Sequence, residues 1–246
     1  MSFVVIVLVP IAENISSLRN RINTSARRAH RNPEEIILMG VTKTVPPQQI
    51  REAYDAGLRI FGENRVQEFA TKAEALRDLH DAVWHMIGHL QTNKAAKSAE
   101  LFAHVDSVDS LRLAQKLNSA AAELGKKLPV LIEINIAGEA AKSGVAPDSA
   151  ALEELLKAAP ELSSLDVHGL MTVPPYHEEP ERSRPYFRRM RALFGQIASR
   201  RLQAVRMEVL SMGMSHDFEV AIKEGATCVR VGTAVFGERP PLRSKI

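Results

Sequence analysis

Short apolar runs alternate with amphipathic segments along almost the whole chain. Each run is long enough for one β-strand and ends in glycine or polar residues. The segments between the runs carry apolar residues at helical spacing, as at Leu113, Leu117 and Leu124. The expected strands are residues 36–42, 58–63, 84–87, 103–108, 130–136, 167–173, 209–212 and 228–232. Strands that alternate with helices in this way predict repeated βα units around a parallel sheet.

The number of βα units and the chain length together favour a (β/α)8 barrel. Such a barrel typically occupies about 250 residues as one domain, and this chain has 246. An open, doubly wound sheet is the alternative. Ile15, Leu18 and Ile22 mark an extra amphipathic helix before the first strand. We therefore predict a single domain over residues 1–246, in which residues 1–10 form an apolar leader and residues 239–246 a tail.

The charge balance argues against a nucleic-acid binder. Since 32 basic residues stand against 29 acidic ones, the net charge is only +3. Arginines cluster within residues 182–201, but Phe187, Met190 and Phe194 recur among them at helical spacing, which indicates the solvated face of a helix. The single cysteine fits a reducing compartment, and the apolar start lacks the features of a signal peptide or a membrane span. We expect a cytoplasmic protein that binds neither nucleic acid nor membranes.

The barrel hypothesis predicts where the functional residues lie, because they gather at the carboxyl ends of barrel strands. Lys43 directly follows the first expected strand and precedes Val45-Pro46-Pro47. A lone lysine in this position most often points into water. At the mouth of a low-dielectric cavity, however, burial shifts a lysine toward the neutral amine, which condenses with aldehydes. The prediction for Lys43 therefore depends on what lies across the barrel mouth.

The loops after the seventh and eighth expected strands are rich in small and hydroxyl-bearing residues. They contain Ser211, Met212, Gly213, Met214 and Ser215 after the seventh strand, and Gly232 and Thr233 after the eighth. Barrels often bind phosphate between these loops and a nearby helix start, where exposed N–H groups meet the anion. Either loop alone is consistent with an ordinary glycine turn. Both together, on the expected strands, predict a phosphate site.

Arg230 lies on the eighth expected strand, on the same face as Cys228 and Gly232, because side chains alternate along a strand. That face is the barrel interior, where a guanidinium needs partners for its charge and its donors. The partner is either an interior acid, such as Glu133 or Glu63, or the ring nitrogen or carboxylate of a ligand. A phosphate site, a reactive lysine and an arginine between them match the needs of pyridoxal 5'-phosphate (PLP).

Longer motifs occur in order between residues 36 and 237. They are Val41-Thr42-Lys43, Phe61-Gly62-Glu63-Asn64, the segment from His85 to Lys94, His168-Gly169-Leu170-Met171, the segment from Ser211 to Asp217, and the segment from Arg230 to Gly237. This set resembles the pyridoxal phosphate homeostasis protein family, the single-domain relatives of the alanine racemase N-terminal barrel. Any one motif can arise by chance, whereas the whole set is specific.

The resemblance implies a barrel of the alanine racemase N-terminal type. It also implies that Lys43 forms a Schiff base with PLP, that the loops after the seventh and eighth strands hold the phosphate, and that Asn64 lines the pocket. It implies a non-enzymatic role in storing PLP or delivering it to PLP-dependent apo-enzymes. We assign no metal-ligating residue. The segment from Trp84 to Lys94 has no assigned role. His85 and His89 either line the pocket or satisfy interior hydrogen bonds, and we favour the second.

The competing function is an amino-acid racemase, which uses the same barrel and lysine. Two-base racemisation needs a second acid or base on the opposite face of the substrate, commonly a tyrosine from a second domain. The chain ends soon after its last strand motif, so we expect no such domain, and a lone barrel favours a monomer. Tyr176, in a loop at the predicted rim, is a weak candidate for the second base. We predict a PLP carrier without substrate turnover.

Overall fold

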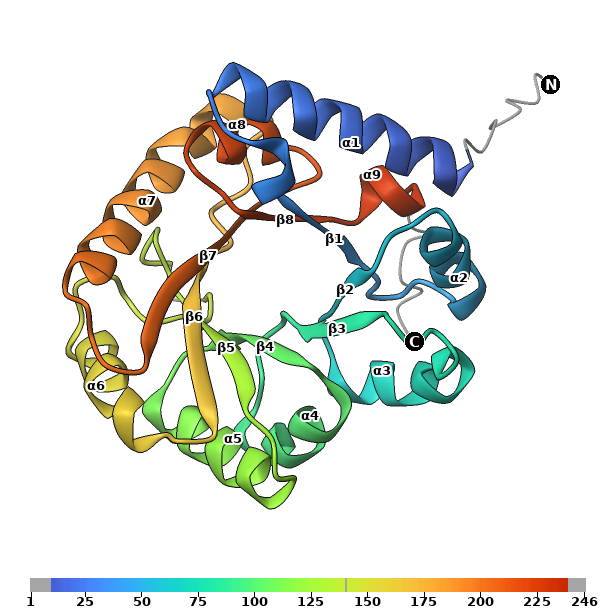
Figure 1. Ribbon diagram of the computed structural model, residues 1–246. Helices are drawn as coiled ribbons and strands as arrows, with labels where there is room; N and C mark the ends of the chain where they lie inside the picture. Colours follow the sequence, from blue (N-terminus) through green and yellow to red (C-terminus); the bar gives the residue numbers. More distant parts are fainter. Residues whose placement is uncertain (1–9, 140, 239–246) are drawn as a thin grey trace.

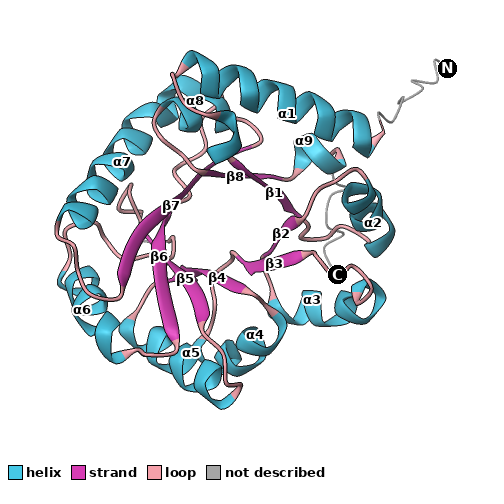
Figure 2. Cartoon of the chain, viewed as in Figure 1, coloured by secondary structure: helices cyan, strands magenta, loops and turns pink. Residues whose placement is uncertain are grey.

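The strands of this protein close into a barrel that helices surround (Figures 1 and 2). The structure is a computed structural model that describes residues 10–139 and 141–238. The strands are β1 (Ile37–Val41), β2 (Ile60–Glu63), β3 (Val83–Met86), β4 (His104–Val108), β5 (Leu128–Glu133), β6 (Leu165–Met171), β7 (Val205–Met214) and β8 (Cys228–Val231). The helices are α1 (Ile11–Arg28), α2 (Pro47–Asp55), α3 (Val66–Ala73), α4 (Ala95–Leu101), α5 (Leu111–Glu123), α6 (Ala150–Ala158), α7 (Arg184–Ser199), α8 (Phe218–Lys223) and α9 (Thr233–Phe236).

The pairing of the first and last strands closes the sheet. β1 and β8 run parallel, with Gly40 opposite Val231, and every other strand pairs in parallel with its neighbour in the chain. The predicted (β/α)8 barrel is therefore confirmed, and the open sheet is wrong. The predicted leader (residues 1–10) lies outside the described residues except for Pro10, and the predicted tail (residues 239–246) lies wholly outside them.

Side chains alternate between the barrel interior and the helix layer, as the pleat of a strand requires. On β8, Val229 and Val231 are fully buried in the core that packs against the helices. Arg230 lies between them and reaches groups on the two preceding strands inside the barrel. The inward direction predicted for Arg230 is therefore confirmed.

The arginine-rich segment forms α7, which buries Phe187, Met190 and Phe194 against the core. Two of its arginines, Arg184 and Arg188, pair with acids. Arg184 pairs with Glu181 and Glu224, for example. This arrangement confirms the amphipathic helix predicted from the spacing of the apolar residues.

The extra N-terminal helix, α1, packs against α8, α9 and α2, outside the part of the barrel where β8 meets β1 (Figure 1). Its apolar stripe, Ile15, Leu18 and Ile22, is buried as predicted. Asn14 Nδ2 donates to the Val235 carbonyl oxygen over 3.0 Å, which ties α1 to α9. Across the described part of the chain, every helix is too short or too polar to cross a membrane.

Candidate functional site

Lys43 lies in the turn directly after β1, at the carboxyl ends of the strands. Gly40 is opposite Val231, so the turn that carries Lys43 and the loop that begins at Gly232 follow neighbouring strands at the same end of the barrel. The sequence placed Lys43 and the phosphate loops on opposite sides of the barrel mouth, whereas β1 and β8 are adjacent strands. The Lys43 side chain is exposed, which contradicts our expectation of a lysine desolvated by burial.

Buried polar groups hold the backbone on both sides of Lys43. Thr42 Oγ1 donates to Glu63 Oε1 over 2.7 Å, and Lys72 Nζ donates to the Thr42 carbonyl oxygen over 2.9 Å. On the other side, the Thr44 N–H donates to a carboxylate of α3. The main chain that carries Lys43 is thus fixed although the Lys43 side chain is exposed.

Glu63 and Lys72 form a buried ion pair behind this turn. The Glu63 side chain is 0% exposed, and its Oε1 lies 3.0 Å from Lys72 Nζ. Burial raises the pKa of the Glu63 carboxyl, whereas Lys72 and Thr42 act in the opposite direction. The other carboxylate oxygen, Oε2, has no hydrogen-bond partner among the described residues. The buried charge of the Glu63 carboxylate is therefore compensated mainly by Lys72.

The loops after β7 and β8 meet at one oxygen atom. Ser215 Oγ accepts hydrogen bonds from the Gly232 N–H over 3.1 Å and from the Ala234 N–H over 3.4 Å. Two backbone donors that converge on a single oxygen have the arrangement that a phosphate oxygen requires. Thr233, between them, is exposed at the rim. The residues present therefore fit the phosphate of PLP.

Gly213 lets the carboxyl end of β7 lie directly on α8. Its φ is +92°, and a Cβ atom there would come within 2.5 Å of Ala221 Cβ and 3.0 Å of Phe218 Cα. Met214, which follows it, donates its N–H to Asp217 Oδ1 over 2.8 Å. Only glycine satisfies both the left-handed backbone and the close contact.

Two residues of the predicted phosphate segment lie away from the rim. Met212 is fully buried in the hydrophobic core, so only its backbone is available to the predicted site. Ser211 is also fully buried, and its hydroxyl faces the barrel interior. The exposed part of the predicted run from Ser211 to Ser215 is therefore shorter than predicted, and the Ser211 hydroxyl bonds Arg230 instead.

Arg230 is held inside the barrel by neutral oxygens. It is 3% exposed. Its Nη1 donates to Ser211 Oγ over 2.6 Å, and its Nη2 donates to the Thr172 carbonyl oxygen over 2.8 Å. No ion pair joins it to a carboxylate of the described residues, so the expected alternative of a salt bridge with Glu133 or Glu63 is wrong. Burial lowers the pKa of Arg230, although a guanidinium stays charged in proteins.

A pocket of about 550 Å³ opens at the carboxyl ends of β2, β3, β5 and β6. Its polar lining consists of Asn64, His89, Glu133, Asn135, Lys142 and Ser143. Asn64 is the one predicted site residue in this lining. Gly88 permits the approach of the β3 loop to β2, since a Cβ atom at Gly88 would come within 2.3 Å of the Asn64 carbonyl oxygen.

Glu133 is the most buried acid in this pocket lining. It is 7% exposed and accepts a hydrogen bond from Ser143 Oγ over 3.0 Å. Burial raises the pKa of its carboxyl, while Ser143 and the charge of Arg230 lower it. From the sequence, Glu133 was predicted only as a possible partner of Arg230, and Ser143 was missed. The available signal was a carboxylate within an apolar expected strand, residues 130–136.

His85 and His89, left without a role by the sequence, have different surroundings. His89 lines the pocket and lies 3.2 Å from Asp109, which contradicts the interior role we favoured for it. His85 lies inside the barrel, where Nδ1 is 3.0 Å from Asp106, as expected for an interior hydrogen bond. Neither histidine contacts Arg230 or the loops after β7 and β8 through a hydrogen bond or ion pair within the described ranges.

Known proteins resemble this chain over nearly its whole length. The sequence model of the alanine racemase N-terminal domain matches residues 12–240. The pyridoxal phosphate homeostasis protein of Aquifex aeolicus is 48% identical over 92% of this chain and 97% of its own length. The protein of the same name from Escherichia coli K12 is 42% identical over 93% of this chain and 97% of its own length.

Solved structures share the fold. PipY of Synechococcus elongatus, with PLP bound, has a TM-score of 0.77 and 37% identity and covers 92% of this chain and 100% of its own. Alanine racemase from Clostridium difficile has a TM-score of 0.68 and 19% identity, and the match covers 58% of that chain. The second similarity concerns the fold alone. The chain belongs to the alanine racemase N-terminal domain family and, within it, to the pyridoxal phosphate homeostasis proteins.

Proposed function

We propose that this protein binds PLP covalently through Lys43 and stores or delivers it without turning over a substrate. The observation that supports the proposal is the pairing of β1 with β8, because the turn with Lys43 and the two backbone N–H groups that converge on Ser215 Oγ follow these adjacent strands. An amine and an oxyanion site at one end of a barrel suit a ligand with an aldehyde and a phosphate. The bound structure of PipY and the names of the relatives support PLP as that ligand.

Each predicted residue has a separate task in this proposal. PLP supplies an aldehyde that reacts with amines, and the chain supplies the groups that hold it. Lys43 provides the amine. The hydroxyls of Ser215 and Thr233 donate to the phosphate, and the N–H groups of Gly232 and Ala234 exchange their present acceptor, Ser215 Oγ, for a phosphate oxygen.

The remaining predicted residues position or enclose the cofactor. Arg230 presents a cation to the interior side of the site, and Ser211 orients it. Gly213 and Met214 shape the phosphate loop through their contacts with α8 and Asp217. Asn64 lines the pocket at the carboxyl ends of β2, β3, β5 and β6.

Covalent binding is tested by trapping the Schiff base with borohydride and locating the modified residue by mass spectrometry. We expect wild-type protein and Lys97→Ala, a change in an exposed lysine paired with Glu100, to give one adduct on Lys43. Lys43→Ala should give none and should lose the absorbance of the bound aldehyde. An adduct that persists on another lysine in Lys43→Ala contradicts the assignment.

A racemase is the second candidate function, because Tyr176 lies in the loop after β6 with its ring 5.3 Å from that of His216. The tyrosine is 71% exposed. Such exposure leaves its hydroxyl in bulk water, which is a poor environment for a base that must be poised near neutral pH. We expect negligible racemisation of alanine and other amino acids by the PLP-loaded protein. Robust racemisation that disappears in Tyr176→Phe would establish the enzyme instead.

We also propose that the protein is a cytoplasmic, single-domain monomer that passes PLP to apo-enzymes. Transfer is tested by mixing loaded protein with an apo-enzyme and comparing its activation with that produced by free PLP at the same concentration. Faster activation by the loaded protein supports direct transfer, and equal rates indicate release into solution. Light scattering coupled to gel filtration gives the oligomeric state.

A further inference from the structure

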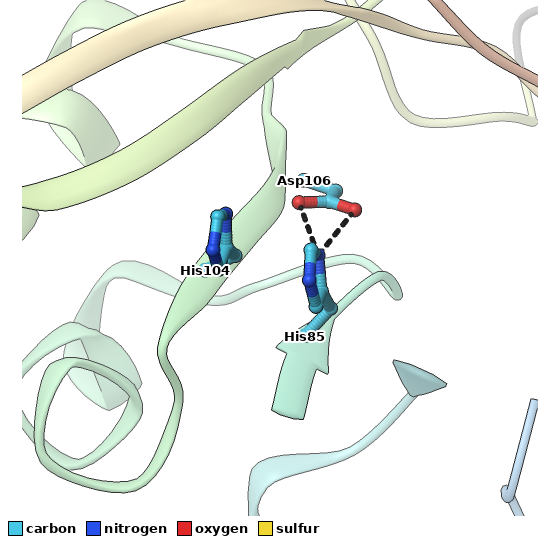
Figure 3. A group of neighbouring side chains, drawn as sticks. All are labelled: His85, His104 and Asp106. Carbon is cyan, nitrogen blue, oxygen red and sulfur yellow. Dashed lines mark hydrogen bonds and ion pairs between the residues drawn. The ribbon is translucent and has the colours of Figure 1, made fainter. Parts of the chain in front are cut away.

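A group of two histidines and one aspartate lies inside the barrel, apart from the residues assigned to PLP. His85 comes from β3, and His104 and Asp106 come from β4 (Figure 3). His85 Nδ1 lies 3.0 and 3.1 Å from the two carboxylate oxygens of Asp106. The rings of His85 and His104 stack with their centroids 4.1 Å apart and their planes at 8°.

Within the described residues, His85 is the only hydrogen-bond partner of Asp106 in this group, and His104 is held by ring stacking on His85. Asp106 is 1% exposed, and within the described ranges its carboxylate is bonded by His85 and by no lysine or arginine. Neither ring nitrogen of His104 has a hydrogen-bond partner in the part of the chain that the structure describes. Buried carboxylates are ordinarily paired or coordinate a metal.

We propose that His85, His104 and Asp106 form a binding site for one divalent transition-metal ion of the Zn²⁺ class. One potential ligand atom of each residue lies within 4.8 Å of those of the other two. Imidazole nitrogens and a carboxylate oxygen bind Zn²⁺ at about 2.0–2.2 Å, which places tetrahedral ligands roughly 3.3 Å apart. The group must therefore contract, and water supplies the remaining ligand.

The stacked rings define the movement that binding requires. The lone pairs of imidazole lie in the ring plane, so two parallel rings cannot both direct a lone pair at one ion. One ring must turn. His104 is the ring that can turn without losing a hydrogen bond, because its nitrogens have none among the described residues, whereas His85 is bonded to Asp106.

A metal at this position would link two adjacent strands. His85 and His104 are register partners in the β3–β4 pair. An ion that binds the folded chain and not the unfolded one stabilises the fold by mass action. The site therefore acts as a structural link across β3 and β4, and it is independent of the proposed function at the barrel mouth.

The test uses full-length protein freed of metal by a chelator, without PLP, and titrated with Co²⁺. We expect wild-type protein to develop visible d–d absorption that saturates at one Co²⁺ per chain. His104→Gln and Asp106→Asn should each lower the apparent affinity at least tenfold, whereas His80→Gln, a change in a histidine outside the group, should not. Zn²⁺ should raise the Tm of wild type and of His80→Gln and leave that of His104→Gln unchanged.

Circular dichroism of the metal-free variants shows whether each is folded, and the two variants of the group serve as independent probes if one fails to fold. Absence of Co²⁺ absorption in wild type overturns the proposal. So does equal Co²⁺ affinity in wild type and in a folded His104→Gln or Asp106→Asn variant. Trapping of PLP on Lys43 is measured separately, so failure of the metal proposal is distinguishable from failure of the proposed function.

Discussion

The Arg230 guanidinium donates to the Ser211 hydroxyl over 2.6 Å, and this bond joins β8 to β7 inside the barrel. Its other terminal nitrogen donates to the carbonyl oxygen of Thr172, directly after β6. One cation therefore ties three neighbouring strands together through neutral acceptors. A buried charge with few acceptors is sensitive to the loss of any one of them.

Ser211→Ala is expected to destabilise the protein, because it leaves the buried guanidinium without one of its two acceptors. The expected loss in the free energy of unfolding is about 1–3 kcal/mol, measured by urea denaturation of the cofactor-free protein. Ser98→Ala is the matched control, since the Ser98 hydroxyl is equally buried and has no partner among the described residues. It should leave stability unchanged or raise it. Equal losses in both variants would show that Arg230 does not depend on Ser211.

Lys72→Met is expected to destabilise the protein more than Ser211→Ala does, because it leaves the Glu63 carboxylate buried without a cation. Breaking a buried pair in this way costs about 3–5 kcal/mol near neutral pH. The double variant Glu63→Gln, Lys72→Met should recover most of that loss, since both charges are then removed. A double variant no more stable than Lys72→Met would refute the dependence of Glu63 on Lys72. Urea denaturation of all three proteins gives the comparison.

The same pair predicts a pH dependence. Burial raises the pKa of Glu63 above its ordinary value of 4.5, so the folded protein holds this proton more tightly than the unfolded chain. The contribution of Glu63 to stability is therefore fully present below pH 4.5 and is lost as the pH rises through the raised folded value. Without Lys72, the pKa of Glu63 in the folded protein rises further, because the nearby positive charge is lost. Lys72→Met should consequently lose more Tm than wild type between about pH 5 and about pH 8, and parallel Tm curves would contradict this.

Gly213→Ala is expected to weaken phosphate binding and stability together. The new Cβ atom would come within 2.5 Å of Ala221 Cβ, and φ at this position is +92°. Gly138→Ala is the matched control, because φ is +73° and a Cβ atom there would have no neighbouring atom within 4 Å among the described residues. The control should lose about 1 kcal/mol from backbone strain alone. Gly213→Ala should lose more, and equilibrium dialysis should show weaker PLP retention. Equal losses of stability and PLP retention in Gly213→Ala and Gly138→Ala would show that close packing at Gly213 is not the cause.

Cys228 is expected to resist thiol reagents in the folded protein. It is fully buried, and burial raises the pKa of its thiol to about 12. At pH 8 the thiolate is then on the order of one part in ten thousand, and the thiolate is the reactive species. Dithionitrobenzoate should label Cys228 slowly in native protein and promptly in urea. Prompt labelling of native protein would indicate that β8 opens readily.

Periodicity was sufficient to predict the barrel, since each βα unit repeats the same apolar pattern. Strand alternation likewise predicted the inward direction of Arg230, because the direction of a side chain on a strand depends on sequence position alone. The prediction for the run from Ser211 to Ser215 did not use this rule and therefore included too many residues. Met212 belongs to the helix-facing core, as alternation within β7 would have predicted.

Other features depend on distances that sequence does not contain. Lys72, on α3, reaches back to the turn that carries Lys43, and no local pattern distinguishes it from a solvated lysine. The acceptor that Thr172 offers to Arg230 is a backbone carbonyl oxygen, which every residue has. His85 and His104 meet only because β3 and β4 are paired in one particular register. Such contacts become predictable only once strand order and register are known.

Closure of the barrel between β1 and β8 has a kinetic consequence. The predicted lysine and the predicted phosphate loops come from opposite ends of the described chain, so the site does not exist in any partly folded form that lacks this seam. Contacts between distant segments form late, because the entropy of closing a long loop must first be overcome. Under the proposed function, acquisition of PLP would therefore report completed folding of the barrel.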